Sequence, residues 1–171
     1  MNTKGKRETM TKTNAMRMLD AAKIAYTVLE YTVDENDLSG IHIAEQLGFD
    51  QNKMFKTLVA RGDKTGPLVF CIPVAEELHL KNAASLTGNK KIEMVPVKEL
   101  LGLTGYIRGG CSPIGMKKKF PTYIHESALD FEEITVSSGT RGAQLLLNTD
   151  SLVRFVGAKV ANLIEKSVNN P

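Results

Sequence analysis

The chain has 171 residues, the usual length of one domain, and its 42% hydrophobic and 24% charged residues exclude disordered and collagen-like classes. Its net charge of +3 is too small to indicate nucleic-acid binding on its own. The longest apolar stretch, 67–75, has nine residues, against the ~20 that a membrane helix needs, and the first ten residues lack the apolar core of a secretory signal. We expect a cytoplasmic protein without membrane contact.

The N-terminal part of the chain predicts a tail, a helix and a strand. Residues 1–11 are polar and basic and are expected to be disordered, so that a single domain spans 12–171. A helix is expected to begin after Thr11 or Thr13, either of which can cap it. The following residues, 25–33, are rich in Tyr, Thr and Val, which favour a strand.

The middle of the chain predicts a hairpin among short helices and strands. Apolar runs at 54–60 and 68–74 are joined by Arg-Gly-Asp-Lys-Thr-Gly-Pro, which is typical of an antiparallel hairpin. Gly48 is suited to end the preceding helix in the left-handed conformation. The sequence predicts helices at 40–47, 76–88 and 97–101, and strands at 92–95, 122–125, 134–136 and 144–147.

The last element expected is a helix from Asp150, as its N-cap, to Lys166. Its apolar stripe would consist of Leu152, Phe155, Val156, Val160, Leu163 and Ile164. The strands are related mostly by hairpins and the helices are clustered, which predicts an α+β fold with a mixed sheet and argues against a doubly wound parallel sheet.

Lys56 is the first residue whose position suggests chemistry. It lies in the sequence Phe-Lys-Thr-Leu-Val, between apolar residues of the first hairpin strand. A buried ammonium is costly unless it is paired or faces a wet cleft, although a lysine stem can also run along a sheet edge to solvent. If Lys56 lines a pocket, partial desolvation lowers its pKa and makes it a strong donor to a carbonyl or phosphate.

Two glycine-rich loops are the other candidates. Residues 109–115, Gly-Gly-Cys-Ser-Pro-Ile-Gly, can turn successive N–H groups toward an anion or an oxyanion, but they lack the Gly-Lys-Ser/Thr ending of a P-loop. Residues 137–142, Ser-Ser-Gly-Thr-Arg-Gly, combine hydroxyls and N–H donors with one cation. Each loop could be a structural turn, but two of them in one small domain suggest that both border a single cleft.

The sequence shows no clear pairing of a nucleophile with a base. Cys111 and Ser112 lie in the first loop, but none of His42, His79 and His125 stands in a context that marks it as their base. The histidines are too scattered for a zinc site, and two cysteines make no disulfide framework. We therefore expect a reaction that needs no protein nucleophile, no metal and no cofactor.

Three motifs follow one another in a fixed order, Phe-Lys-Thr-Leu at 55–58, Gly-Gly-Cys-Ser-Pro-Ile-Gly at 109–115 and Val-Ser-Ser-Gly-Thr-Arg-Gly at 136–142. With them the chain resembles, from about residue 13 to 168, the YbaK/EbsC family of free-standing tRNA editing deacylases, which are related to the insertion domain of bacterial prolyl-tRNA synthetase. The resemblance implies an α+β domain with a curled, barrel-like, mixed and largely antiparallel sheet flanked by helices. It implies a single aminoacyl-tRNA editing domain that removes cysteine mischarged onto tRNA(Pro), and cysteine from Cys-tRNA(Cys) as well.

The resemblance carries the family's functional residues over to this sequence. Lys56 and Gly110 match the pocket lysine and the loop that would stabilise an oxyanion, and they are the expected catalytic residues. Gln144 stands where some members carry an aspartate; its amide oxygen can accept a hydrogen bond but brings no charge. The expected substrate-binding residues are Tyr31, Thr57, Gly109, Ser112, Pro113, Ser137, Gly139, Arg141 and Gln144.

The expected substrate explains the missing nucleophile. A cysteinyl ester carries its own thiol, and a site that folds the thiol onto the ester would drive cyclisation to a thiolactone, a lyase-type reaction; attack by water would make the enzyme a hydrolase. Alternatives are an editing deacylase for another small amino acid such as alanine, or a non-catalytic RNA- or partner-binding module of the same fold.

The partner implied by the resemblance is aminoacyl-tRNA, with prolyl- or cysteinyl-tRNA synthetase as a further candidate. The basic run Lys117, Lys118 and Lys119 follows the first glycine loop directly. We expect it to contact tRNA phosphates near the acceptor end, the alternative being a solvated surface.

Overall fold

The computed structural model describes residues 11–164, so nearly all of the predicted tail at 1–11 lies outside the described residues. Within that range the structure has five α-helices and eight strands. The helices are α1 (Asn14–Ala21), α2 (Gly40–Leu47), α3 (Leu80–Thr87), α4 (Val97–Thr104) and α5 (Thr149–Val156). The strands are β1 (Tyr26–Glu30), β2 (Phe55–Gly62), β3 (Gly66–Pro73), β4 (Ile92–Met94), β5 (Thr122–His125), β6 (Glu133–Ser137), β7 (Ala143–Asn148) and β8 (Lys159–Ala161).

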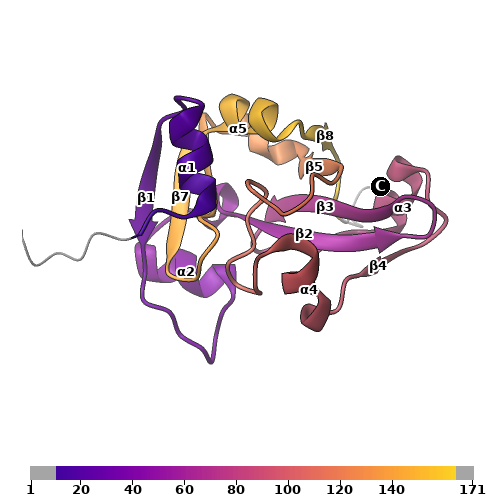
Figure 1. Ribbon diagram of the computed structural model, residues 1–171, viewed down its shortest axis with the longest axis horizontal. Helices are drawn as coiled ribbons and strands as arrows, with labels where there is room; N and C mark the ends of the chain where they lie inside the picture. The colour runs from indigo at the N-terminus through magenta and orange to yellow at the C-terminus, as the bar shows by residue number, and fades with distance from the viewer. Residues whose placement is uncertain (1–10, 165–171) are drawn as a thin grey trace, which may run out of the picture.

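The strands form two sheets, which confirms the α+β class with mixed, largely antiparallel pairing. An antiparallel sheet has the order β1-β7-β6, and a mixed sheet has the order β4-β2-β3-β5-β8, in which β5 runs parallel to both β3 and β8. A parallel bridge between Met54 and Thr135 links the two. Figure 1 shows the β2–β3 hairpin running roughly at right angles to β1 and β7, with α4 below it and α5 above.

Local signals explain the well-predicted elements. The Thr13 hydroxyl accepts a hydrogen bond from the N–H of Met16 and caps α1. Thr13 is one of the two threonines expected from the sequence to cap this helix. Gly48, at φ +62°, ends α2 in the left-handed conformation, as predicted. The hairpin of β2 and β3 pairs in register from Phe55–Pro73 to Gly62–Gly66. α3 begins later than predicted, because the Nδ1 atom of His79 accepts from the N–H of Asn82 and caps the helix there.

The main core lies between the two sheets and is closed by α1 and α5. It is formed by fully buried side chains from both sheets and from both helices, including Leu19, Phe55, Ile134, Leu145 and Leu152. A second cluster packs α3 against the opposite face of β2 and β3. Because β3 is buried on both faces and paired on both edges, the hairpin that carries Lys56 is held firmly in the middle of the molecule.

The predicted C-terminal helix from 150 to 166 is wrong in both of its ends. The side chain of Asn148, and not Asp150, caps α5, and Gly157, at φ +66°, ends it. The chain then forms β8, which pairs with β5, so Val160 lies on a strand and Leu163 is buried beyond it. The spacing of the apolar residues from 152 to 164 is that of a helix face, but Gly157 adopts a left-handed conformation and ends the helix. No helix within 11–164 has the length and apolar character needed to cross a bilayer.

Candidate functional site

A small pocket of about 90 Å³ opens where β2 meets the two glycine-rich loops. Its polar lining comes from β2, from the first loop and from the β6–β7 hairpin, and consists of Lys56, Thr57, Gly109, Cys111, Ser137 and Gln144. Its apolar lining comes from α2 and the segment before it, from the start of β2 and the residue before it, and from the residue after β3, and includes Leu38, Ile43, Met54, Phe55 and Val74. The expectation that both loops border one cleft is thereby confirmed.

The pocket adjoins a larger cleft of about 600 Å³, called the outer cleft here, and both are lined by Lys56, Thr57, Gly109 and Cys111. The pocket of about 90 Å³ is called the inner pocket. The walls of the outer cleft are the segment 36–40 on one side and β4 with the start of α4 on the other. Met94 and Val97 contribute exposed apolar surface to this wall. The arrangement offers a small chamber beside a larger, partly apolar cleft.

Lys56 is the charged group of the inner pocket. Burial lowers the pKa of its ammonium, and the nearby carboxylates of Glu77 and Glu76 oppose that shift. Among the described residues Lys56 has no ion-pair partner within salt-bridge distance. The side chain lines the pocket, as the interpretation of Lys56 as a ligand-binding residue requires. The ammonium is free to donate to an oxygen atom of a ligand.

A hydrogen bond from a neighbouring strand fixes the side chain of Gln144. Its side chain is buried, and its Oε1 atom accepts a hydrogen bond of 3.1 Å from the hydroxyl of Thr135 on the neighbouring strand β6. One lone pair of the amide oxygen is therefore engaged by Thr135, which fixes the side chain, and the second lone pair and the Nε2 amide remain available to a ligand. Where an aspartate would present a negative charge, this chain presents a neutral amide.

The two glycine loops touch each other at Gly110. A Cβ atom at this position would lie 3.1 Å from backbone atoms of Thr140 and Arg141. The Nε atom of Arg141 donates to the carbonyl of Arg108 at 2.9 Å and ties the loops together a second time. The N–H of Gly110 donates to the carbonyl of Ile107 at 3.0 Å, so in this conformation it is not free to stabilise an oxyanion. The neighbouring Gly109 lines the pocket.

The remaining expected site residues lie around the pocket without lining it. Ser112 is fully buried, and its hydroxyl accepts from the N–H of Ile114 within the loop. Gly139, at φ +102°, leaves room for the ring of Tyr106. Tyr31 lines a small adjacent crevice together with Gly109. These residues shape the loops, whereas Pro113 faces a different pocket altogether.

Within the part of the chain that the structure describes, the pocket contains no activated cysteine and no histidine that could serve as a base. Burial raises the pKa of both Cys71 and Cys111 to about 12, so both thiols stay protonated at neutral pH. None of His42, His79 and His125 lines the inner pocket or the outer cleft. Among residues 11–164, no three His, Cys, Asp or Glu side chains are grouped as metal ligands would be.

Replacing Gly110 with alanine is expected to reduce activity strongly. The added Cβ would press on the backbone of the second loop, which would have to move by several tenths of an ångström and carry Ser137 and Arg141 with it. We expect turnover to fall by about tenfold or more, since ångström-scale misplacement of binding groups is costly in rate. Gly102→Ala, which has open space around its Cβ, is the matched control. Unchanged activity of Gly110→Ala would contradict the close contact of the loops.

Comparison with known proteins assigns the chain to a family. Residues 41–155, which contain Lys56 and both glycine loops, match the model of the aminoacyl-tRNA editing domain, and the chain belongs to this family. A close relative is EbsC of Enterococcus faecalis, named as a candidate Cys-tRNA(Pro)/Cys-tRNA(Cys) deacylase; it is 47% identical over 161 residues, which cover 94% of this chain and 98% of the relative.

Solved structures agree with this assignment. A crystal structure described as a candidate trans-editing enzyme for prolyl-tRNA synthetase is 26% identical and superimposes with a TM-score of 0.77, covering 89% of this chain and 93% of the other. The hypothetical protein APE2540, at 22% identity, shares the fold with a TM-score of 0.79 over 87% of this chain and 97% of its own.

Sequence reasoning missed two parts of the site. Thr135, which fixes Gln144, carries no local signal, because a threonine inside a strand is ordinary. The outer wall formed by Met94 and Val97 does carry one, since these apolar residues flank Pro96 and remain exposed. Cys111 occupies a position that the motif leaves variable, yet it lines both parts of the cleft.

Proposed function

We propose that the protein deacylates aminoacyl-tRNA in the cytoplasm, removing cysteine from mischarged tRNA(Pro) and from Cys-tRNA(Cys). The observation that carries this proposal is a small pocket with one unpaired lysine and no activated nucleophile. An aminoacyl ester is already activated, so a site that positions it and stabilises charge is sufficient. The family and the name of the Enterococcus faecalis relative support the same reaction.

The sizes of the two chambers support a small amino acid as the group removed. The inner pocket of about 90 Å³ is well below the ~300–1,000 Å³ of sites that hold whole small-molecule ligands, so it suits the aminoacyl group alone. The outer cleft, at about 600 Å³, falls within that range and suits the terminal nucleoside. The ester bond would then lie beside Lys56 and Gly109, which line both chambers.

The proposed reaction uses the substrate's own thiol. The sulfur attacks the ester carbonyl carbon, the bond from that carbon to the ribose oxygen breaks, and the thiol proton is transferred to the departing oxygen. The products are a cysteine thiolactone and uncharged tRNA. The Lys56 ammonium donates to the carbonyl oxygen as negative charge develops there, in a setting where partial desolvation strengthens the interaction.

The test is an assay of the purified protein on tRNA(Pro) charged with cysteine, alanine or proline, and on Cys-tRNA(Cys). We expect both cysteinyl substrates to be deacylated and Pro-tRNA(Pro) to be spared. Faster removal of alanine than of cysteine would favour the alternative editing specificity. No deacylation of any substrate would leave a non-catalytic RNA- or partner-binding module. Repeating the assay with prolyl- or cysteinyl-tRNA synthetase present tests our further proposal that a synthetase partner improves tRNA selectivity.

We also propose that the basic run after the first loop contacts tRNA phosphates. Its three side chains are exposed; Lys117 reaches toward the end of α4, where its Nζ atom lies 3.5 Å from the carbonyl of Gly102, and Lys118 and Lys119 border another pocket. Replacing Lys117, Lys118 and Lys119 with alanine is expected to weaken tRNA binding and to flatten its dependence on salt, because fewer counterions are released. If a filter-binding assay shows the same dependence of tRNA affinity on salt concentration, the three lysines are ordinary solvated surface residues.

A further inference from the structure

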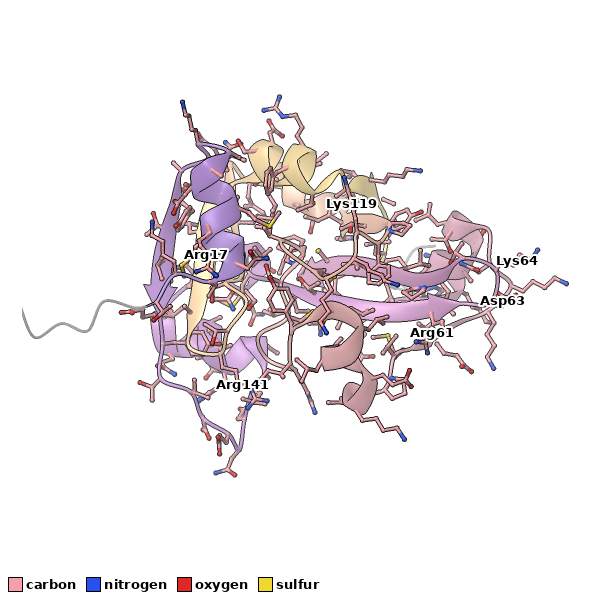
Figure 2. All side chains as sticks on the ribbon, in the orientation of Figure 1. Arg17, Arg61, Asp63, Lys64, Lys119 and Arg141 are labelled. Carbon is pink, nitrogen blue, oxygen red and sulfur yellow. The ribbon has the colours of Figure 1, made fainter. Side chains whose placement is uncertain are left out.

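A second pocket borders the same glycine loop but shares no residue with the site around Lys56. Its volume is about 310 Å³, and it lies between α1, the loop residues from Pro113 onward and the end of α5. Met18, Ile114, Phe120 and Phe155 give it an apolar and partly aromatic lining, and Lys118 and Lys119 stand at its border. Figure 2 shows Lys119 beside α5 and β5, away from Arg141 of the second glycine loop.

The two lysines give this pocket a clear charge preference. Both are exposed, and neither has a salt-bridge partner within residues 11–164. A ligand that matches this pocket therefore combines an apolar group, which packs on the aromatic lining, with an anionic group, which binds the lysines. A nucleotide has this combination, since its base can stack on an aromatic ring while its phosphate meets the ammonium groups.

Asn14 adds a polar group that can distinguish one base from another. Its Nδ2 atom donates to the carbonyl of Gly115 at 3.2 Å, which holds the side chain at the pocket and leaves the Oδ1 atom as an acceptor. Cytosine, adenine and guanine carry an exocyclic amino group that can donate to such an oxygen, whereas uracil can donate only its ring N3–H, at a different place on the base.

We propose that this pocket binds an unpaired nucleotide of an RNA ligand, with the base in the apolar slot and its phosphate on Lys118 and Lys119. The proposal rests on the proposed function, in which the single-stranded end of a tRNA enters the outer cleft. Cys111 borders that cleft and Pro113 borders the second pocket, and two residues span at most ~7 Å of chain. The two pockets therefore border the same loop, and in this proposal a strand that ends beside Lys56 passes this loop and places one of its preceding nucleotides in the second pocket.

The test measures binding at the second pocket separately from turnover. The full-length, ¹⁵N-labelled protein is titrated with the tetranucleotides ACCA and UUUU, and with inorganic phosphate, while the amide signals of Met116, Phe120 and Phe155 are followed by NMR. We expect ACCA to shift these signals in a saturable manner, more tightly than UUUU or phosphate. The same shifts are expected in Lys56→Ala, because Lys56 is not part of this pocket.

Two variants test the proposed contacts. The double variant Lys118→Ala/Lys119→Ala is expected to weaken ACCA binding by about tenfold and to reduce its salt dependence. The matched control Lys64→Ala/Lys90→Ala removes the same charge at the far end of the β2–β3 hairpin, where Figure 2 shows Lys64, and is expected to bind normally. Phe155→Leu keeps the apolar volume but removes the ring, and about a fivefold loss is expected.

The proposal is overturned if the three amide signals do not shift, if UUUU or phosphate saturates them equally well, or if the two double variants lose affinity to the same degree. These results are distinct from a failure of the proposed function. Absence of deacylation on every charged tRNA would refute the enzymatic activity while the shifts at the second pocket persist, and active enzyme without these shifts would refute the second pocket alone.

Discussion

Replacing Lys56 with alanine is expected to abolish deacylation of Cys-tRNA(Pro) while the protein remains folded. Within residues 11–164 Lys56 is the only lysine that lines the inner pocket, so its loss removes the group proposed to stabilise the developing oxyanion. Loss of one such donor typically lowers turnover by ~10²–10³-fold. Because Lys56 makes no ion pair with a described residue and is partly desolvated, the folded state loses no strong interaction with it. Single-turnover rates and the melting temperature measure the two effects.

Lys98→Ala is the matched control for this experiment. Lys98 lies on α4 beside the outer cleft, is exposed, and does not line either chamber. Its replacement removes the same charge from the same region of the surface and is expected to leave turnover intact. Near-normal turnover of Lys56→Ala would show that Lys56 is a strand residue with no chemical role.

The second large effect concerns the thiol of the substrate. Serine in place of cysteine on tRNA(Pro) is expected to slow deacylation by about a hundredfold or more, because a hydroxyl is a far weaker nucleophile at neutral pH than a thiol, which is a few per cent ionised. In contrast, Cys111→Ala is expected to remain active, because burial holds the pKa of the Cys111 thiol at about 12. Comparison of Ser- and Cys-charged tRNA(Pro) with both enzymes measures the two predictions.

Two outcomes would contradict the substrate-thiol mechanism. If Cys111→Ala were inactive although folded, the protein thiol would be the nucleophile. If seryl and cysteinyl esters reacted equally fast, water would have to attack in both cases, and the reaction would be a hydrolysis. Cys71→Ala serves as the control for packing, since Cys71 is also buried but does not line the pocket; its sulfur lies 3.8 Å from the hydroxyl oxygen of Thr57.

The sequence predicted those parts of the fold that depend on neighbouring residues. The β2–β3 hairpin follows from its turn-rich connector, and the end of α2 follows from Gly48. The final helix failed because the apolar spacing of Val160 and Leu163 imitates a helical face, while the decisive residue, Gly157, lies in the middle of the pattern. Periodicity alone cannot show which glycine adopts a positive φ.

The candidate site was predictable in its residue types but not in its contacts. Lys56 among apolar residues and two glycine-rich loops are visible in the sequence, and five of the expected residues line the pocket: Lys56, Thr57, Gly109, Ser137 and Gln144. The roles of Gly110 and Gln144 depend on contacts with Thr140 and Thr135, and only the folded chain reveals them. These contacts join residues that are far apart in the sequence or on neighbouring strands, so no local pattern indicates them.

The position of β8 has a consequence for the order in which the molecule is assembled. β8 forms the edge of the mixed sheet from residues far along the chain from the β2–β3 hairpin, and it pairs in parallel with β5, which is itself parallel to β3. Parallel pairs join distant segments, so they form slowly, whereas the local β2–β3 hairpin can form early. During synthesis the strand that carries the pocket lysine is therefore expected to pair first, and the outer edge of its sheet can close only after residues 159–161 have been made.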